Sequence, residues 1–125
     1  MSDSKLGELA WIDLSVSNAG ETKDFYQSVV GWGVEEVSMG EYSDYAMTSK
    51  DSGEPVSGIC HAKGVNEDLP ACWLPYFLVA DVEAAVKAVE EKGGALVTKI
   101  KSMGSDKYVV IKDPAGAHCA LYQKG

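Results

Sequence analysis

The sequence predicts an α+β fold made of two βαβββ repeats whose curved mixed sheets surround a cavity. The same order of segments occurs twice: a strand, a capped helix and three further strands. The predicted helix starts, Asn18 and Asp81, are 63 residues apart, and the glycines that end the helices, Gly31 and Gly93, are 62 residues apart. Each half alone is too small to bury both faces of a four-stranded sheet. The 125 residues are therefore expected to form a single domain, with repeat one over about 9–62, a linker over 63–72 and repeat two over about 73–123.

Repeat one begins with residues 9–17, where apolar side chains alternate with a mixed set as in a half-buried strand. Asn18, with Glu21 three residues later, predicts a capping box for a helix that ends at Gly31. The helix shows the i, i+3, i+4, i+7 spacing of a packed stripe, which we assign to the core: Thr22, Phe25, Tyr26 and Val29. Strands are predicted at 32–38, 42–49 and 55–62, between turns rich in Gly, Asp and Ser.

Repeat two begins with a predicted strand at 73–80, after which Asp81 caps a helix that Gly93 closes. One face of this helix is apolar and consists of Val82, Ala85, Val86 and Val89. Strands are predicted at about 95–101, 107–112 and 117–123, and residues 113–116 (DPAG) form the turn before the last one.

Composition and charge exclude several classes of function. The apolar fraction of 46% is ordinary for a soluble chain, and no apolar run approaches the roughly 20 residues that span a bilayer, so we expect no membrane partner. The net charge is −8 and every basic residue is Lys, which argues against nucleic-acid binding. An acidic surface suits a cationic ligand, or simply keeps a protein soluble. No apolar leader segment is present and the three cysteines form no CxxC, so we expect free thiols in the cytoplasm.

A series of short segments spans about residues 8–123. They are residues 11–18, Phe25-Tyr26, Gly31-Trp32, residues 73–81, Gly93-Gly94, and residues 113–117 with Leu121. In this order they resemble the vicinal oxygen chelate superfamily, the glyoxalase and bleomycin-resistance fold, and most of all the predicted enzymes related to lactoylglutathione lyase. The resemblance implies the fold described above, a small-molecule ligand and a homodimer. Function does not follow from it, because the superfamily includes isomerases, dioxygenases, thiol transferases and plain binders.

The resemblance also implies four cavity-facing positions for metal ligands, on the first and last strand of each repeat. Counting back from Asn18 and Asp81 places Trp11 and Leu74 at two of them, and Ala120 stands where the family motif has a glutamate. The position on the strand at 55–62 stays open, with His61 as a candidate. Trp, Leu and Ala offer no donor to a divalent cation, so we expect no metal and no other cofactor. Glyoxalase I activity is therefore not expected, and the absence of Arg, the usual partner of glutathione carboxylates, supports this.

Strand alternation predicts the ligand pocket. Because Leu14 and Phe77 are expected to lie under the helices, their neighbours Asp13 and Tyr76 should point into the cavity. On the last strand, Cys119 and Leu121 are expected to face the helix layer. The complete predicted pocket is Trp11, Asp13, Leu74, Tyr76, His118, Ala120 and Tyr122.

Several pocket residues have two readings. Trp11 either stacks on a planar ligand or fills the space of the lost metal. Asp13 acts as a general base or cation anchor, or is held by neighbouring hydroxyls. His118 is an acid–base group or a partly exposed structural residue. Tyr76 and Tyr122 either donate hydrogen bonds to a ligand or fill the core.

Two function hypotheses follow from these residues. The first is a metal-free small-molecule-binding protein that sequesters a planar or cationic organic ligand, with Asp13 as its anchor. The alternative is a lyase-, isomerase- or dioxygenase-like enzyme on a small carbonyl metabolite, with Asp13, His118 and Tyr76 as acid–base groups. The best candidates for catalytic residues are Asp13 and His118. Cys60 and His61 do not form a nucleophile pair, because neighbours on a strand point to opposite faces.

Overall fold

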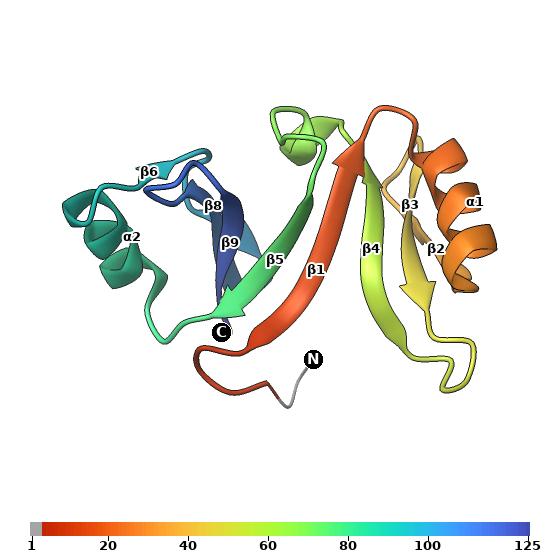
Figure 1. Ribbon diagram of the computed structural model, residues 1–125, viewed down its shortest axis with the longest axis horizontal. Coiled ribbons are helices and arrows are strands. Elements are labelled where there is room, and N and C mark those ends of the chain that lie inside the picture. Colours follow the sequence, from red (N-terminus) through yellow and green to blue (C-terminus); the bar gives the residue numbers. More distant parts are fainter. Residues whose placement is uncertain (1–3) are drawn as a thin grey trace. The chain divides into compact units, whose positions relative to one another are not determined.

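The computed structural model describes residues 4–125 (Figure 1). The chain divides into two compact units: the first unit is Ile12–Trp73, and the second unit combines the segment up to Trp11 with Leu74–Gly125. Strands and helices follow one another as βαβββ in both halves of the sequence, with one extra short strand in the second. The α+β class is therefore confirmed. No helix in the described part of the chain is long and apolar enough to cross a membrane.

The first unit is a four-stranded sheet with one helix. Its elements are the part of β1 (Leu9–Val16) from Ile12 onward, α1 (Ala19–Val30), β2 (Gly33–Ser38), β3 (Ser43–Thr48) and β4 (Pro55–His61), followed by a short 3₁₀ turn at Gly64–Asn66. The strands lie in the order β2-β3-β4-β1, and β1 runs parallel to β4 whereas the other pairs are antiparallel. The helix α1 lies alongside this sheet (Figure 1).

The core of the first unit lies between α1 and the sheet, where Ala19, Met47 and Ile59 are fully buried. Tyr26 packs against this core, and its ring stacks on Trp32 at 5.8 Å between centroids. Its hydroxyl also accepts a hydrogen bond of 3.0 Å from the indole N–H of Trp73. Tyr26 therefore joins α1 to two tryptophans from outside the helix.

The prediction that the apolar stripe on α1 belongs to the core is wrong for two of its residues. Phe25 is 57% exposed and Val29 is 64% exposed, so neither belongs to the core, whereas Tyr26 does. Ala19 and Tyr26 are seven residues apart and share one helix face, and this face meets the sheet. Phe25 and Val29 lie on the flank of that face, where no strand of the unit covers them.

The helix ends follow the sequence signals in three of four cases. Gly31 ends α1 in the left-handed region with φ of 83°, and Gly93 follows α2 (Val82–Glu91) with φ of 91°. The Asp81 carboxylate accepts hydrogen bonds from the backbone N–H groups of Glu83 and Ala84, as a helix cap does. The predicted capping box at Asn18 is wrong: among the described residues its side chain caps no helix N–H, and its oxygen lies 3.4 Å from Thr22 Oγ1.

The second unit contains β5 (Trp73–Leu78) from Leu74 onward, α2, β6 (Ala95–Leu96), β7 (Lys101–Met103), β8 (Asp106–Lys112) and β9 (His118–Gln123). The strand order is β5-β9-β8-β6, and β7 pairs with β8. The single strand predicted at 95–101 is thus divided into two short ones. The segment before β1 joins this unit through hydrogen bonds between Gly7 and Leu78 (2.7 Å) and between Leu78 and Glu8 (3.0 Å).

The core of the second unit lies beneath α2, where Val82, Val109 and Ile111 are buried. Cys119 and Leu121 pack against these residues, so the prediction that both face the helix layer is confirmed. The DPAG turn also forms as predicted, with the backbone N–H of Asp113 donating to the carbonyl of Ala117 at 2.9 Å.

Candidate functional site

In the first unit, Asp13 and Cys60 project from the sheet face opposite α1. Asp13 pairs with Gly58 and Ser15 pairs with Cys60, while the intervening pairs, Leu14 with Ile59 and Val16 with His61, alternate to the other side. Val16 and Ile59 belong to the core under α1, which fixes that side as the helix face. Asp13 and its neighbour Leu14 thus lie on opposite faces of the sheet, as predicted. The assignment of Asp13 and the half-buried Trp11 to a ligand pocket stays a prediction.

The thiol of Cys60 lies in an acidic environment. Burial raises its pKa most, and the negative charges of Asp13 and Asp44 together with a hydrogen bond to Asp44 raise the pKa further. Cys60 is therefore a neutral thiol near pH 7, and a thiol that stays protonated is a poor nucleophile. All three cysteines are free thiols.

Asp44, on β3, is a buried carboxylate that sequence analysis did not single out. Its Oδ1 accepts the backbone N–H of His61 at 2.8 Å and lies 3.3 Å from His61 Nδ1. The hydrogen bond to Cys60 adds a third donor. The one available cue was an acid inside the predicted strand at 42–49, where a charge needs partners.

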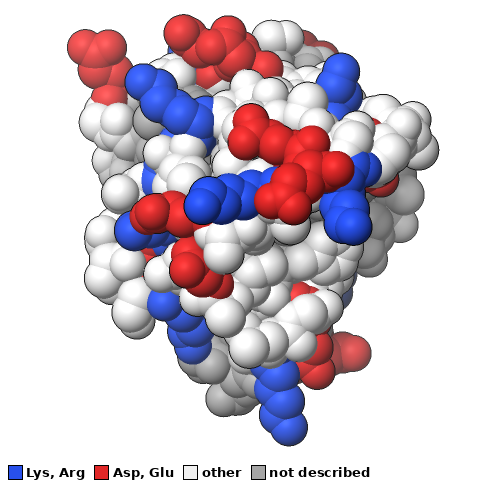
Figure 2. All heavy atoms as spheres, turned by 90° about the vertical axis from the view of Figure 1, so that its left-hand side faces the viewer, with Lys and Arg blue, Asp and Glu red and all other residues white. Residues whose placement is uncertain are grey.

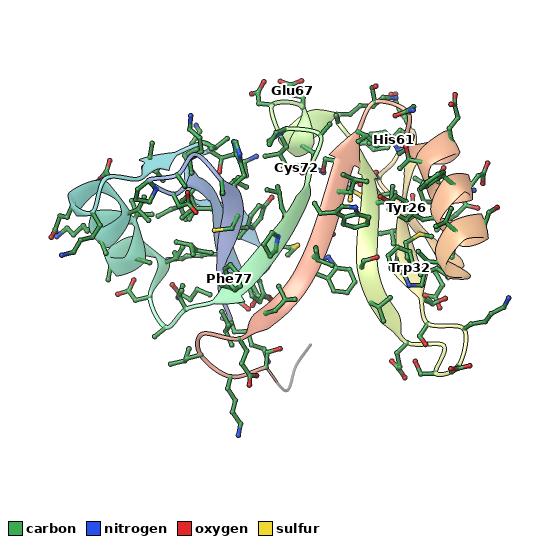
Figure 3. All side chains as sticks on the ribbon, in the orientation of Figure 1. Tyr26, Trp32, His61, Glu67, Cys72 and Phe77 are labelled. Atoms are coloured by element: carbon green, nitrogen blue, oxygen red, sulfur yellow. The ribbon has the colours of Figure 1, made fainter. Side chains whose placement is uncertain are left out.

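The open position of His61 is settled by the strand register. His61 pairs with Val16 and has the parity of the helix face, and its ring lies between Tyr42 and Tyr45 with centroid distances of 5.4 and 5.9 Å. Figure 3 shows its side chain on the side of β4 toward α1. His61 therefore does not share the sheet face of Asp13.

In the second unit, the predicted residues share the face opposite α2. Tyr76 pairs with Ala120, and Tyr122 pairs with Tyr108, while Leu121 alternates to the helix side. The rings of Tyr76 and Tyr108 are 6.1 Å apart. Leu74 and Ala120 are fully buried, and His118 lies half-buried at the start of β9 opposite Lys112.

The hydroxyl of Tyr122 is already engaged within this unit. It donates a hydrogen bond to the Asp106 carboxylate, which also accepts the backbone N–H of Gly125. Burial and Asp106 raise the pKa of Tyr122 to about 12, and the hydrogen bond from Tyr122 lowers the pKa of Asp106. The Tyr122 proton, which one of the two sequence-based interpretations directed to a ligand, is therefore directed to Asp106.

Phe77 differs from expectation. It pairs with Leu121 and so has the parity of the helix side, but it is 37% exposed. The core beneath α2 is built around Val82, Val109 and Ile111, and Phe77 is not among the described residues that pack against it. The prediction that Phe77 is buried under a helix is wrong for this reason.

Comparison with known proteins agrees with the fold. The profile of the Glyoxalase/Bleomycin resistance protein/Dioxygenase superfamily matches residues 8–120. The chain belongs to this superfamily. A superfamily member from Vibrio splendidus has a similar structure, with a TM-score of 0.57, 18% identity, and coverage of 91% of this chain and 97% of that one. Methylmalonyl-CoA epimerase in complex with methylmalonyl-CoA and NH₄⁺ also has a TM-score of 0.57, at 17% identity over 97% of this chain and 96% of that one.

Two curated relatives are similar in sequence over nearly the whole chain. Anthracycline biosynthesis protein DnrV of Streptomyces peucetius is 32% identical over 132 residues, which cover 95% of this chain and 48% of that protein. Putative glyoxylase CFP32 of Mycobacterium tuberculosis is 32% identical over 125 residues, which cover 98% of this chain and 48% of that protein. The chain therefore spans about half the length of these relatives.

The residues at the superfamily's metal positions do not fit a divalent cation. Trp11, Leu74 and Ala120 carry no donor atom suited to it, and His61 lies on the other face of its sheet from Asp13. Among the described residues, no group of three or more His, Cys, Asp or Glu side chains is placed to hold a metal ion. We therefore derive no chemical step through a metal.

Proposed function

We propose that the protein binds a small organic ligand without a metal, and that Asp13 is the anionic anchor for a planar or cationic molecule. The observation that carries this proposal is the Cys60 thiol, whose pKa is raised first by burial and then by the negative charges of both Asp13 and Asp44. Two carboxylates that act on one group create a concentrated negative potential on this sheet face. A potential of that sign attracts a cation and opposes an anion.

Composition supports the same ligand class. The chain has no Arg and a net charge of −8, so it lacks the planar fork that usually holds phosphates and carboxylates. Trp11 and Tyr76 are the aromatic residues that we propose as contacts for a planar ligand, because a cation favours an aromatic face. The remaining residues of the proposed pocket are His118, Tyr122 and the fully buried Leu74 and Ala120.

The test is a thermal-shift screen of planar cations against neutral molecules of the same shape, each with and without divalent metals. A ligand that binds the native state raises the melting temperature by mass action, and we expect added metal to leave this increase unchanged. For a cation identified in this way, Asp13→Asn should weaken binding by about 1–3 kcal/mol, the range for a hydrogen bond to a charged group.

The control for this variant is Asp51→Asn, which removes the same charge from an exposed turn. It should change the affinity little, because exposed charges are strongly screened. Equal affinity of the wild type and Asp13→Asn for every cation found would remove Asp13 as the anchor. Dependence of binding on added Zn²⁺ or Ni²⁺ would contradict a metal-free site.

The second candidate function is a lyase-, isomerase- or dioxygenase-like enzyme on a small carbonyl compound. It is favoured by the relative named as a putative glyoxylase and by the epimerase with the same fold. Asp13, His118 and Tyr76 are its proposed acid–base groups. Proton exchange next to a carbonyl in D₂O, followed by NMR, tests it: exchange that Asp13→Asn and His118→Gln both slow supports an enzyme, and exchange at the uncatalysed rate excludes this proton-abstraction route.

We also propose that the protein forms a homodimer and resides in the cytoplasm. The curated relatives are about twice as long, so a second copy of this chain would match their length. Three free cysteines suit a reducing compartment. Light scattering at micromolar concentration should give twice the chain mass of 13.3 kDa, and a one-chain mass would contradict the dimer.

A further inference from the structure

The second unit contains a cavity that the proposed function does not use. Its volume is about 320 Å³, and it lies between α2 and the end of β8 with the turn that follows. The side chains that shape it are Ala85, Ala88, Val89, Lys92, Ile111 and Pro114. None of the proposed ligand residues lines it. Its volume is at the lower end of the range of roughly 300–1,000 Å³ that is usual for ligand pockets.

The helix α2 provides one wall of this cavity. Ala85, Ala88, Val89 and Lys92 follow the helical spacing that places residues on one face. Two of these residues are alanines, and their small side chains leave open space. At the bottom, a Cβ on Gly94 would meet the carbonyl oxygen of Lys112 at 2.7 Å, so the chain is closely packed there.

The polar groups along this wall already have partners. The carbonyls of Ala88 and Val89 accept the N–H groups of Lys92 (3.0 Å) and Gly94 (2.9 Å). The carboxylate oxygen of Asp113 accepts the N–H groups of Ala115 (2.8 Å) and Ala117 (3.0 Å). What the cavity offers a ligand is therefore mainly hydrocarbon surface.

The exceptions are the two lysines of the lining, Lys92 and Lys112, of which Lys92 belongs to the α2 wall. Ion pairs are found at Lys23, His61 and Lys107, and among the described residues Lys92 forms none. Figure 2 shows basic and acidic side chains interspersed on the side of the molecule that faces the viewer there, with no broad basic patch. An ammonium next to an apolar hollow favours a molecule that combines a hydrocarbon body with a single negative charge.

We propose that this cavity binds a small monocarboxylate, with its hydrocarbon chain against Ala88, Val89 and Ile111 and its carboxylate at the Lys92 ammonium. An amine is disfavoured, because it would bring a second positive charge to Lys92 and the one carboxylate of the wall, Asp113, is held in the turn. This ligand class has the opposite charge to the one proposed for Asp13. Failure of either proposal therefore leaves the other testable.

The test is an NMR titration of the ¹⁵N-labelled protein with hexanoate, hexan-1-ol and hexylamine. Burial of a five-carbon chain, offset by the free-energy cost of association, predicts a dissociation constant of about 1 mM or weaker for hexanoate, with shifts concentrated on α2 and residues 111–114. Loss of the exposed ion pair should make hexanol about two- to fivefold weaker, and hexylamine weaker still. Equal binding of hexanoate and hexylamine, or shifts elsewhere in the protein, would overturn the proposal.

Two matched pairs of variants locate the site. Ala88→Trp fills the cavity and should abolish the titration, while Ala84→Trp, on the exposed part of the same helix, should leave it intact. Lys92→Gln should weaken hexanoate about two- to fivefold without affecting hexanol, and Lys87→Gln should change neither. Dispersed spectra confirm that each variant is folded. Unchanged affinity in Ala88→Trp or in Lys92→Gln would refute the assignment.

Discussion

Asp44 Oδ1 accepts the backbone N–H of His61 at 2.8 Å and lies 3.3 Å from the imidazole Nδ1 of the same residue. One carboxylate oxygen thus binds both the backbone and the side chain of a residue 17 positions away. The contact lies where the pairing of β3 with β4 ends, at Tyr45 and Ile59. Asp44 therefore closes the end of the ladder and orients the His61 ring at the same time.

We expect Asp44→Ala to destabilise the protein by about 1–3 kcal/mol, because a backbone N–H in a half-buried position and the Cys60 thiol lose their acceptor. The free energy of unfolding in urea measures this cost. Asp44→Asn keeps a side-chain oxygen and should lose less. If the alanine variant were as stable as the wild type, Asp44 would have no role in holding the strand end.

The pH dependence of stability should show the influence of Cys60. Its pKa is raised above the ordinary value of 9.0, so the native state binds this proton more tightly than the unfolded chain does. The contribution is fully present below pH 9, and the free energy of unfolding should fall as the pH rises above 9. Cys60→Ala should make this fall shallower between pH 9 and 10, and an unchanged slope would show that Cys60 is not responsible.

Asp106 should control the ionisation of Tyr122. The pKa of Tyr122 is about 12, through burial and then through the hydrogen bond and charge of Asp106. Asp106→Asn removes the charge and should lower this pKa, whereas Tyr122→Phe should remove one high-pH step from the tyrosine absorbance titration. A tyrosine absorbance titration curve of Asp106→Asn that is identical to that of the wild type would contradict this prediction.

The two neighbouring aromatics of α1 should differ in their contribution to stability. Tyr26→Phe leaves the Trp73 N–H without its acceptor and should cost about 0.5–1.5 kcal/mol, and Tyr26→Ala should cost more because its packing is also lost. Phe25→Ala, at an exposed position, should change the stability of the monomer by less than about 0.5 kcal/mol. Urea denaturation measures these changes in the free energy of unfolding. Equal losses of stability in Phe25→Ala and Tyr26→Ala would contradict the observed orientation of α1.

The sequence by itself determined the features that depend on neighbouring residues. Alternation along β1 and β9 predicted the sides of Asp13 and Leu121, Asp81 predicted a helix cap, and Gly31 predicted a helix end. These signals are local, because a strand alternates every residue and a cap involves one turn of helix.

The tertiary structure alone decided the contacts between distant residues. Which flank of α1 meets the sheet depends on the rotation of the helix, and this made Tyr26 a core residue and left Phe25 exposed. The engagement of Asp44 with His61 and of Tyr122 with Asp106 depends on how neighbouring strands are aligned. A sequence pattern shows that a side chain needs a partner, but only the register of the strands brings a particular partner within hydrogen-bonding distance.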